Sequence, residues 1–353
     1  MSRSLRIGVV DQSPVYDGRP AAEALRRSVE LAKRCEAAGY SRYWVAEHHN
    51  TPSYASPAPE ILIAAIASQT RQIRVGSGGV MLSHYSPLKV AETFSSLQAL
   101  FPGRIDLGVG RAPGGSSLST HALAYPGFPS GGELYSEQLA DLLALVRNQL
   151  PDGHQYQGLR AMPGTETPPA PWVLGSGSGS TRLAASLGAG FVLALFIGTD
   201  YRSPEIIRSY RKAFRPGGFG DQPSAMLATA VICADSMEEA KFVASTHTYW
   251  KLQAHLHGNR EGLRPPEEVQ TLYRQLSPSD RAYFDETLRT MILGTPGQCR
   301  DQLELLSDEY AVDEILAINV TYRFSDRVKC YEELAKVMEL NPEHSAPALT
   351  RVG

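Results

Sequence analysis

The sequence predicts an α/β fold in which one closed (β/α)8 barrel, a TIM barrel, takes up most of the 353 residues. Short apolar runs alternate along the chain with segments whose apolar residues recur at helical spacing. The runs are continuous, as expected of parallel strands that crossover helices cover on both faces. Eight such units are explained better by a closed barrel than by an open sheet.

The strands are expected at short, mainly apolar runs that end in polar or glycine-rich turn signals. The first run ends in the polar sequence Asp-Gln-Ser-Pro, and the third runs into Gly78-Gly79. The expected strands lie at residues 5–10, 43–46, 73–79, 104–109, 172–174, 191–195, 226–234 and 314–320.

The helices are expected from apolar positions three or four residues apart, often opened by proline and closed by glycine. In the first helix, Ala22, Leu25, Val29 and Ala32 share one face and Gly39 ends the segment. The expected helices lie at residues 20–38, 61–68, 87–100, 133–150, 180–187, 204–214, 237–257, 296–306 and 326–339.

The chain is longer than the 250 residues typical of such a barrel. We expect the surplus in insertions after strands 4 and 7, the second of them the polar stretch at about 258–294. The barrel domain is expected to span 1–340, followed by a C-terminal tail over 341–353.

Composition excludes several classes of protein. Lys and Arg total 34 against 37 Asp and Glu, which leaves no basic surplus for nucleic acid. No apolar run approaches the roughly 18 residues that a membrane span needs. The N-terminus lacks the apolar core of a secretory signal, so a cytoplasmic protein is expected. The four cysteines are scattered and are expected to be free thiols, and no metal site is expected.

A glycine- and serine-rich segment, GSGSGST at 175–181, stands between a predicted strand and a predicted helix. Backbone amides at a helix N-terminus favour an anion, and glycine lets them approach phosphate oxygens closely. An ordinary glycine turn with a serine cap is the alternative. The dinucleotide fingerprint would need glycine where Ser180 stands, and the chain has no P-loop sequence.

Arg111 follows the fourth predicted strand and is the expected second phosphate ligand, because its N–H fork matches phosphate oxygens. A solvent-exposed arginine is the alternative. Strands 4 and 5 are neighbours, so Arg111 and the serine loop are expected to hold one phosphate between them. A single phosphate suits a mononucleotide such as FMN better than a dinucleotide.

His48 and His49 follow the second predicted strand. Adjacent residues on extended chain point opposite ways, so one imidazole is expected to face the barrel mouth, where it can act as acid or base near neutral pH. Packing alone is the alternative role. His247, His255 and His257 share one predicted helix at a spacing that matches no zinc motif, and they are expected to be solvated.

Five motifs, in order along nearly the whole chain, resemble the bacterial luciferase-like flavin-dependent monooxygenase family. These are EHHNTP at 47–52, VGSGGV at 75–80, PGRIDLGVGR at 102–111, SGST with AASLG at 178–188, and GTPG at 294–297. Each motif alone is weak, and their order at successive strand ends makes the resemblance specific.

The resemblance implies a TIM barrel that uses reduced FMN or, in some branches, the deazaflavin F420. It implies that His48 acts as a base near the flavin and that a cis peptide bond joins Gly78 to Gly79 beneath the flavin ring. Arg111 and the loop of Ser176, Gly177, Ser178 and Ser180 would bind the phosphate. By a looser alignment, Ser13 and Trp250 would line the substrate pocket, although Trp250 is as well explained by core packing. The reactive cysteine of luciferase is replaced by Gly110, so bioluminescence is not implied.

The sequence therefore predicts an enzyme, an FMN-dependent monooxygenase that acts with O2 on a small organic substrate. The alternatives are a hydride-transferring oxidoreductase that uses F420 or NAD(P)H, and a non-catalytic flavin-binding protein. No reductase domain is visible, so a separate flavin reductase is expected to supply reduced FMN. The resemblance also implies a homodimer.

Overall fold

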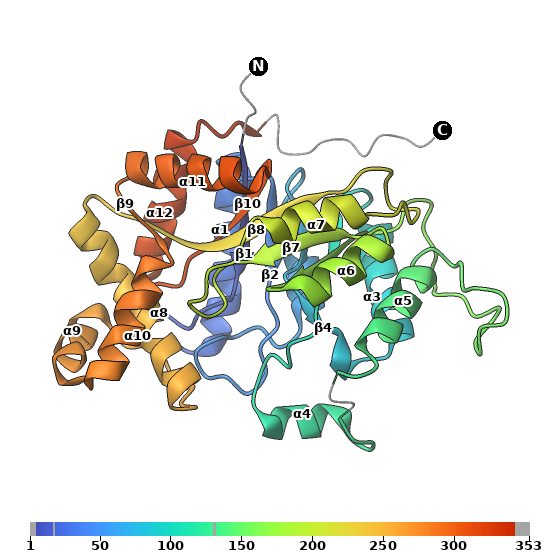
Figure 1. The fold of residues 1–353 in the computed structure, drawn as a ribbon, viewed down its shortest axis with the longest axis horizontal. Helices are drawn as coiled ribbons and strands as arrows, with labels where there is room; N and C mark the ends of the chain where they lie inside the picture. The colour runs from blue at the N-terminus through green and yellow to red at the C-terminus, as the bar shows by residue number, and fades with distance from the viewer. Residues whose placement is uncertain (1–4, 17, 130–131, 343–353) are drawn as a thin grey trace.

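The computed structural model describes residues 5–16, 18–129 and 132–342, and these residues form a closed parallel barrel (Figure 1). The strands of the barrel wall pair in the order β10-β1-β2-β3-β5-β6-β7-β8, and the pairing of β10 with β8 closes the ring. This confirms the predicted fold class. The wall consists of β1 (Arg6–Asp11), β2 (Arg42–Val45), β3 (Arg74–Ser77), β5 (Ile105–Gly110), β6 (Ala170–Gly175), β7 (Gly190–Ala194), β8 (Ala225–Cys233) and β10 (Glu314–Ile318).

Two further short strands extend the wall. The third predicted strand is interrupted at its glycines, and β4 (Val80–Met81) resumes beyond them and pairs with the end of β5. β8 is long, so its last residues project past β10 and pair with β9 (Ile292–Gly294). β9 lies within the expected polar insertion and was not predicted as a strand.

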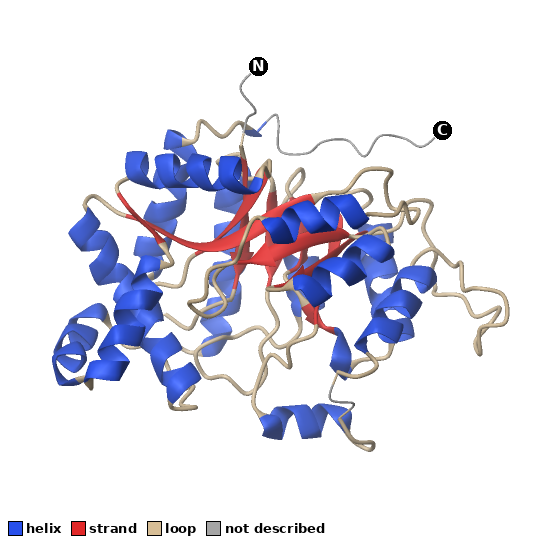
Figure 2. Cartoon of the chain, in the orientation of Figure 1, coloured by secondary structure: helices blue, strands red, loops and turns tan. Residues whose placement is uncertain are grey.

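Helices cover the outside of the barrel wall, as Figure 2 shows. Most lie within a few residues of their predicted positions, but α4, α9 and α10 were not predicted. The helices are α1 (Ala21–Ala37), α2 (Pro59–Gln69), α3 (Pro87–Leu100), α4 (Ser117–Ala124), α5 (Tyr135–Leu145), α6 (Ser178–Ser186), α7 (Glu205–Ala213), α8 (Met237–Leu256), α9 (Pro266–Gln275), α10 (Pro278–Arg289), α11 (Pro296–Tyr310) and α12 (Phe324–Val337), with a 3-10 turn η1 (Leu82–His84).

Two layers of apolar side chains hold the barrel together. The larger cluster lies between the strands and the surrounding helices and includes Leu31, Ile63 and Phe94. A second cluster fills the barrel interior and includes Trp44 and Trp172, whose ring centroids lie 5.9 Å apart. The interior is therefore packed solid, and any ligand site must lie above it, at an end of the barrel.

The amino-terminal end of the barrel is closed by ion pairs. The Arg42 guanidinium donates to Glu314 at 2.7 Å and to Asp106 at 2.7 Å, and Arg74 donates to Asp106 at 2.6 Å. All four side chains are buried and come from the first residues of β2, β3, β5 and β10. These paired charges hold the starts of four strands together, which is a structural role.

The insertion expected at about 258–294 contains α9 and α10 and ends in β9. With α8, these helices form a unit at the left of Figure 1 that has a small core of its own around Leu252, Val269 and Phe284. The expected tail over 341–353 lies outside the described residues apart from 341 and 342. None of the described helices is long and apolar enough to cross a membrane.

Candidate active site

The structure brings Arg111 and the serine loop to one cavity, of about 620 Å3, at the carboxyl ends of β5 and β6. The side chains and backbone that line it come from the end of β5, the start of α5 and the first turns of α6. The lining residues are Arg111, Gly132, Tyr135, Ser136, Ser176, Gly177, Gly179, Ser180, Arg182, Leu183 and Ser186. The structure thus brings Arg111 together with Ser176, Gly177 and Ser180, while Ser178 is exposed and does not line the cavity.

The glycines of this loop serve two different purposes. A Cβ on Gly175 would lie 2.3 Å from the Cβ of Ser180, so the strand end can turn back under the helix only with glycine there. A Cβ on Gly177 or Gly179 would meet no atom within 4 Å. These two glycines therefore leave open space at the cavity wall, which suits the close approach of an anion.

Helix α6 begins two residues earlier than predicted, at Ser178, with Gly177 as its N-cap. No side chain caps this end of the helix. The first-turn amides therefore face the cavity region without a capping oxygen, and the helix dipole adds positive potential there. An anion of one phosphate's size matches these donors.

Tyr135, the first residue of α5, is a cavity residue that the sequence analysis missed. Its side chain is buried, its hydroxyl has no hydrogen-bond partner among the residues that the structure describes, and Arg111 lies close enough for its charge to act on the phenol. A buried hydroxyl without a partner is costly unless a ligand or water satisfies it. Nothing in the sequence distinguishes this tyrosine from the other residues of the predicted helix, so no sequence signal pointed to it as a site residue.

A second cavity, of about 850 Å3, adjoins the first through Arg111 and Gly132. It lies beneath α4, which stands apart from the helices around the barrel (Figure 1), and residues of η1 and α4 line it, among them His84 and His121. The expected insertion after the fourth strand thus forms the wall of this cavity.

Gly78 and Gly79 lie at the end of β3, and the peptide bond between them is cis, as the resemblance implied. A Cβ on Gly79 would approach the Gly108 carbonyl oxygen to 2.7 Å, and one on Gly78 would approach the Trp44 Cβ to 3.2 Å. Packing against β5 therefore requires glycine at position 79, and packing against β2 strongly favours glycine at position 78. Gly78 remains partly exposed at the barrel mouth.

Glu47 fixes the loops around these glycines. Its carboxylate is buried, with Oε1 lying 2.7 Å from His49 Nε2 and accepting a hydrogen bond from the Tyr85 hydroxyl at 2.8 Å. Its Oε2 accepts from the Met81 backbone amide at 3.1 Å. Glu47 thereby binds β4 to the end of β2, and His49 serves this structural network.

His48 points the other way from His49, as predicted for adjacent residues. Its ring packs on that of Tyr54, with centroids 4.6 Å apart, and its Nδ1 is buried without a hydrogen-bond partner. Burial, reinforced by the charges of His49 and Arg260, lowers the pKa of His48 to about 4. The imidazole is therefore neutral at pH 7 and able to accept a proton.

Trp250 on α8 continues this aromatic wall. Its ring contacts Tyr54 edge to face at a centroid distance of 4.9 Å, and its Nε1–H is buried without a partner. His247, one helical turn earlier, is buried, so the expectation that it is solvated was wrong. It lies on the inward face of α8, whereas His255 and His257 are exposed.

Ser13, which was expected to line the substrate pocket, is buried in the structure. Its side chain has no exposed surface, and its hydroxyl accepts a hydrogen bond from Ser28 at 3.0 Å. Its backbone amide donates to Asp11 at 2.6 Å, which holds the loop after β1. The structure does not bring Ser13 to a cavity surface, because the Asp11 carboxylate draws this loop inward.

Several buried polar atoms at the barrel mouth have no hydrogen-bond partner among the described residues. They belong to residues at the ends of β1 and β2, in the loop after β2 and on α8. These atoms are Gln12 Oε1, His48 Nδ1, Tyr54 Oη and Trp250 Nε1. Buried polar atoms are nearly always hydrogen-bonded, so this concentration indicates a place where ligand groups bind.

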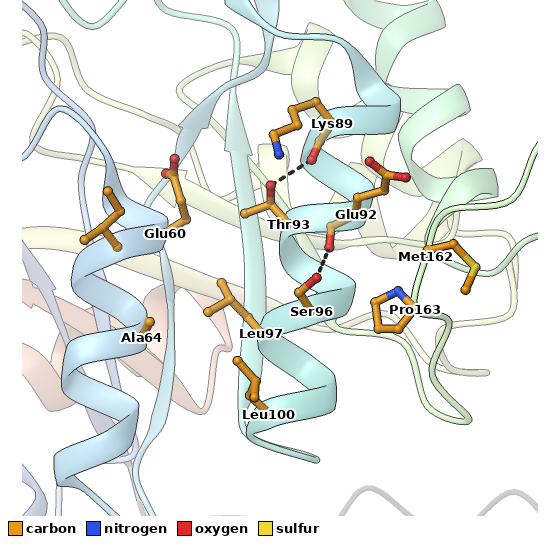
Figure 3. Close-up of a pocket in the computed structure, with 11 residues that line it drawn as sticks. Glu60, Ala64, Lys89, Glu92, Thr93, Ser96, Leu97, Leu100, Met162 and Pro163 are labelled. Carbon is orange, nitrogen blue, oxygen red and sulfur yellow. Dashed lines mark hydrogen bonds between the residues drawn. The ribbon is translucent and has the colours of Figure 1, made fainter.

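A separate groove, of about 780 Å3, lies on the outside of the barrel between α2 and α3 (Figure 3). Its lining includes Ile61, Leu100 and Met162, all well exposed, and it contains none of the predicted site residues. Among the described residues, no group of three or more His, Cys, Asp or Glu could hold a metal ion, and the four cysteines are free and buried.

Residues 5–313 match the sequence profile of the family described as luciferase-like monooxygenase. The N-acetyl-S-alkylcysteine monooxygenase of Bacillus subtilis is 37% identical over 88% of this chain and 92% of its own length. The crystal structure of apo-MsnO8 superposes with a TM-score of 0.84 at 35% identity, covering 96% of this chain and 99% of that one.

More distant solved structures share the fold with different cofactors. The oxygenating component of 3,6-diketocamphane monooxygenase from Pseudomonas putida, in complex with FMN, gives a TM-score of 0.68 at 17% identity, with 94% and 97% of the two chains covered. An F420-dependent secondary alcohol dehydrogenase gives 0.70 at 15% identity, with 95% and 99% covered. At these identities the likeness shows the fold alone.

Proposed function

Because the chain belongs to the luciferase-like monooxygenase family, we propose that it is an FMN-dependent monooxygenase that uses reduced FMN and O2 to oxygenate a small organic substrate. The observation that carries the proposal is the cavity that joins Arg111 to the uncapped N-terminus of α6. Its donor set of one guanidinium, helix amides and hydroxyls fits the phosphate of a mononucleotide.

The residues present fit this cofactor at both ends. Arg111, Ser176 and Ser180 would hold the phosphate, with the Gly177 and Gly179 backbone admitting it closely. The Tyr135 hydroxyl, which has no partner within the described residues, would complete the set. Gly78-Gly79 would lie against the ring, since the chain there is partly exposed at the mouth.

Reduced FMN, when bound, supplies the electrons with which O2 is activated. His48 would accept or return a proton at Nδ1, the atom that has no partner in the protein. Its neutral imidazole at pH 7 is the form needed for a base. The aromatic rings of Tyr54 and Trp250 beside it would exclude water from the reacting groups.

A second candidate is hydride transfer with F420. The observation in its favour is the second cavity, which shares Arg111 with the first and could receive a cofactor tail longer than a phosphate. A non-catalytic flavin-binding protein is less well supported, because such a protein has no need of a mouth-facing neutral imidazole.

The experiment that tests the proposal is a pair of absorbance titrations of the apoprotein, one with FMN and one with F420, followed by oxygen uptake with photoreduced FMN. We expect FMN to bind and, at equal oxygen uptake, less hydrogen peroxide to be released when a substrate is added, because one oxygen atom then enters the product and the other forms water. For the substrate, the name of the Bacillus subtilis relative suggests a thioether panel as a first choice. Saturable binding of F420 without binding of FMN would replace the proposal by its alternative.

The partners and location follow from the same proposal. A separate flavin reductase would supply reduced FMN in the cytoplasm, because the described residues form one barrel without a reductase domain, as the sequence predicts. A homodimer would cover the exposed apolar side chains of the α2–α3 groove, Ile61 and Leu100 among them. Light scattering should give twice the mass of one chain, and Ile61→Glu should lower it.

A further inference from the structure

The cavity around Arg111 is larger than one phosphate group needs. Its volume is about 620 Å3, within the range of about 300–1,000 Å3 that holds whole drug-sized ligands. The flavin ring would not fill the remainder, because Gly78, Gly79 and His48 at the barrel mouth do not line this cavity. The proposed function therefore accounts for only one part of it.

One face of α6 forms a wall of the cavity beyond the first turn of the helix. Gly179, Arg182, Leu183 and Ser186 all line the cavity, at the three- and four-residue spacing of a single helix face. Seven residues of helix rise about 10 Å, which is the length of this face from Gly179 to Ser186. The start of α5 contributes Ser136, so the cavity continues from the N-terminus of α6 into the space between α5 and α6 (Figure 1).

Arg182 gives this second part of the cavity a positive charge. No Asp or Glu lines the cavity, and within the described residues neither Arg111 nor Arg182 forms an ion pair. Like charges in one cavity repel each other, and an anion that contacts both guanidinium groups stabilises them. Side chains on a helix lean toward its N-terminus, so Arg182, three residues beyond Gly179, has the reach to act beside the first phosphate site.

The hydroxyl groups of the lining add hydrogen-bond donors. Ser186 Oγ already donates to the Leu183 carbonyl oxygen at 3.0 Å. Tyr135, by contrast, is only 5% exposed, and its hydroxyl has no partner in the part of the chain that the structure describes. A buried hydroxyl of this kind indicates a ligand with acceptor oxygens in the cavity.

We propose that the cavity binds a diphosphate, with one phosphate at Arg111 and the N-terminus of α6 and the other at Arg182 and Ser136. The first half of this site is the phosphate site of the proposed function, on which the inference therefore rests. The diphosphate could belong to the flavin dinucleotide FAD or to free pyrophosphate. In FAD, the adenosine would leave the cavity on its outer side, where Ser136, Arg182 and Ser186 are exposed.

Calorimetric titration of the apoprotein with inorganic phosphate and with pyrophosphate tests the second half of the site. We expect pyrophosphate to bind about 10-fold more tightly than phosphate, because Arg182 adds charge-assisted hydrogen bonds. Arg182→Gln should weaken pyrophosphate binding by about 10-fold and leave phosphate binding unchanged. Since Arg182 is exposed, the melting temperature should stay the same. Arg26→Gln, at an exposed position on α1 outside both cavities, should change none of these quantities.

Titrations of the same variants with FMN and FAD identify the source of the diphosphate. If it belongs to the cofactor, Arg182→Gln weakens FAD binding and leaves FMN binding unchanged, whereas an effect on pyrophosphate alone identifies a free diphosphate ligand.

Two results would overturn the inference and leave the proposed FMN site in place. One is a pyrophosphate affinity that does not depend on Arg182. The other is an equal loss of phosphate and pyrophosphate affinity in Arg182→Gln, which would assign both guanidinium groups to a single phosphate. Pyrophosphate binding that depends on Arg182 in a protein that binds no FMN would instead reject the proposed function and leave the diphosphate site in place.

Discussion

The imidazole of His48 lies over the phenol ring of Tyr54, with ring centroids 4.6 Å apart and planes inclined by 37°. Tyr54 in turn meets Trp250 edge to face, so the orientation of one histidine depends on a helix that begins almost two hundred residues later in the chain. The stack buries Nδ1 and keeps the imidazole neutral. The imidazole is therefore held in one orientation by the protein itself.

Replacing His48 by Ala should leave FMN affinity almost unchanged and lower turnover by about 100-fold or more, the usual contribution of a general base. The reason is that His48 does not line the cavity assigned to the phosphate. Stopped-flow turnover beside an FMN titration measures both. His257→Gln, at an exposed position, is the matched control, and undiminished turnover in His48→Ala would remove this residue from the mechanism.

Arg111→Ala should weaken FMN binding by roughly 10- to 100-fold, the loss expected for a charge-assisted hydrogen bond. The exposed Arg111 has no ion pair to lose within the described residues, so the melting temperature should stay the same. Arg160→Ala, which alters an exposed arginine away from both cavities, should change neither quantity. An unaltered FMN dissociation constant in Arg111→Ala would contradict the assigned phosphate site.

Two glycines of one loop should respond in opposite ways. Gly179→Val places a side chain in open space at the cavity, so FMN binding should fall while thermal stability is maintained. Gly175→Ala brings a Cβ to 2.3 Å from Ser180, so stability should fall by about 1–3 kcal/mol. Calorimetry of the apoproteins measures the thermal stability of both variants and distinguishes them. Normal FMN affinity in a stable Gly179→Val variant would show that the phosphate lies elsewhere.

Stability should depend on pH through His48. Its pKa is about 4 in the folded protein and 6.5 when unfolded, so the unfolded chain binds the extra proton between these values. The free energy of unfolding should therefore fall as pH decreases from 6.5 to 4, by up to roughly 3 kcal/mol for this group. Buried His247, whose pKa is also lowered, adds in the same direction. Urea titrations at several pH values should show that the free energy of unfolding of His48→Gln changes less between pH 6.5 and 4 than that of the unaltered protein. An equal change in both proteins would refute the assignment.

Arg327→Met should destabilise the fold strongly. The Arg327 guanidinium is fully buried, pairs with Asp11 at 2.9 Å and donates to the Tyr16 hydroxyl. Its removal leaves a buried carboxylate unpaired, at a cost of about 3–5 kcal/mol. Urea unfolding measures the change. Arg208→Met on the exposed face of α7 should change stability by less than about 0.5 kcal/mol, and equal losses in both variants would contradict the assigned pairing.

The strand positions could be predicted because parallel strands are buried on both faces and read as continuous apolar runs. The positions of Arg111 and the serine loop were predictable for the same reason. Each follows the carboxyl end of a predicted strand, and these two strands, β5 and β6, are neighbours. Helix α4 was missed because its sequence, SLSTHALA, is short and follows a run of glycine and serine.

Other features depend on contacts between distant segments, which local patterns do not record. Ser13 turned inward because Asp11 meets Arg327, which follows more than three hundred residues later. His247 and Lys251 are buried because the second half of α8 packs against loops at the barrel mouth, a placement that its sequence pattern does not reveal. The Tyr135 hydroxyl is notable only through the partner it lacks.

The extension of β8 beyond the barrel brings together the two ends of the segment that follows it, so that this segment can be exchanged as a unit. Its pairing with β9 brings the Ala234 amide to 3.0 Å from the Gly294 carbonyl oxygen, so the segment between them leaves and rejoins the barrel at the same place. That segment carries Trp250, Lys251 and Arg260, whereas Arg111 belongs to the barrel itself. The segment could therefore be exchanged as one unit while the strands that position Arg111 stay unchanged.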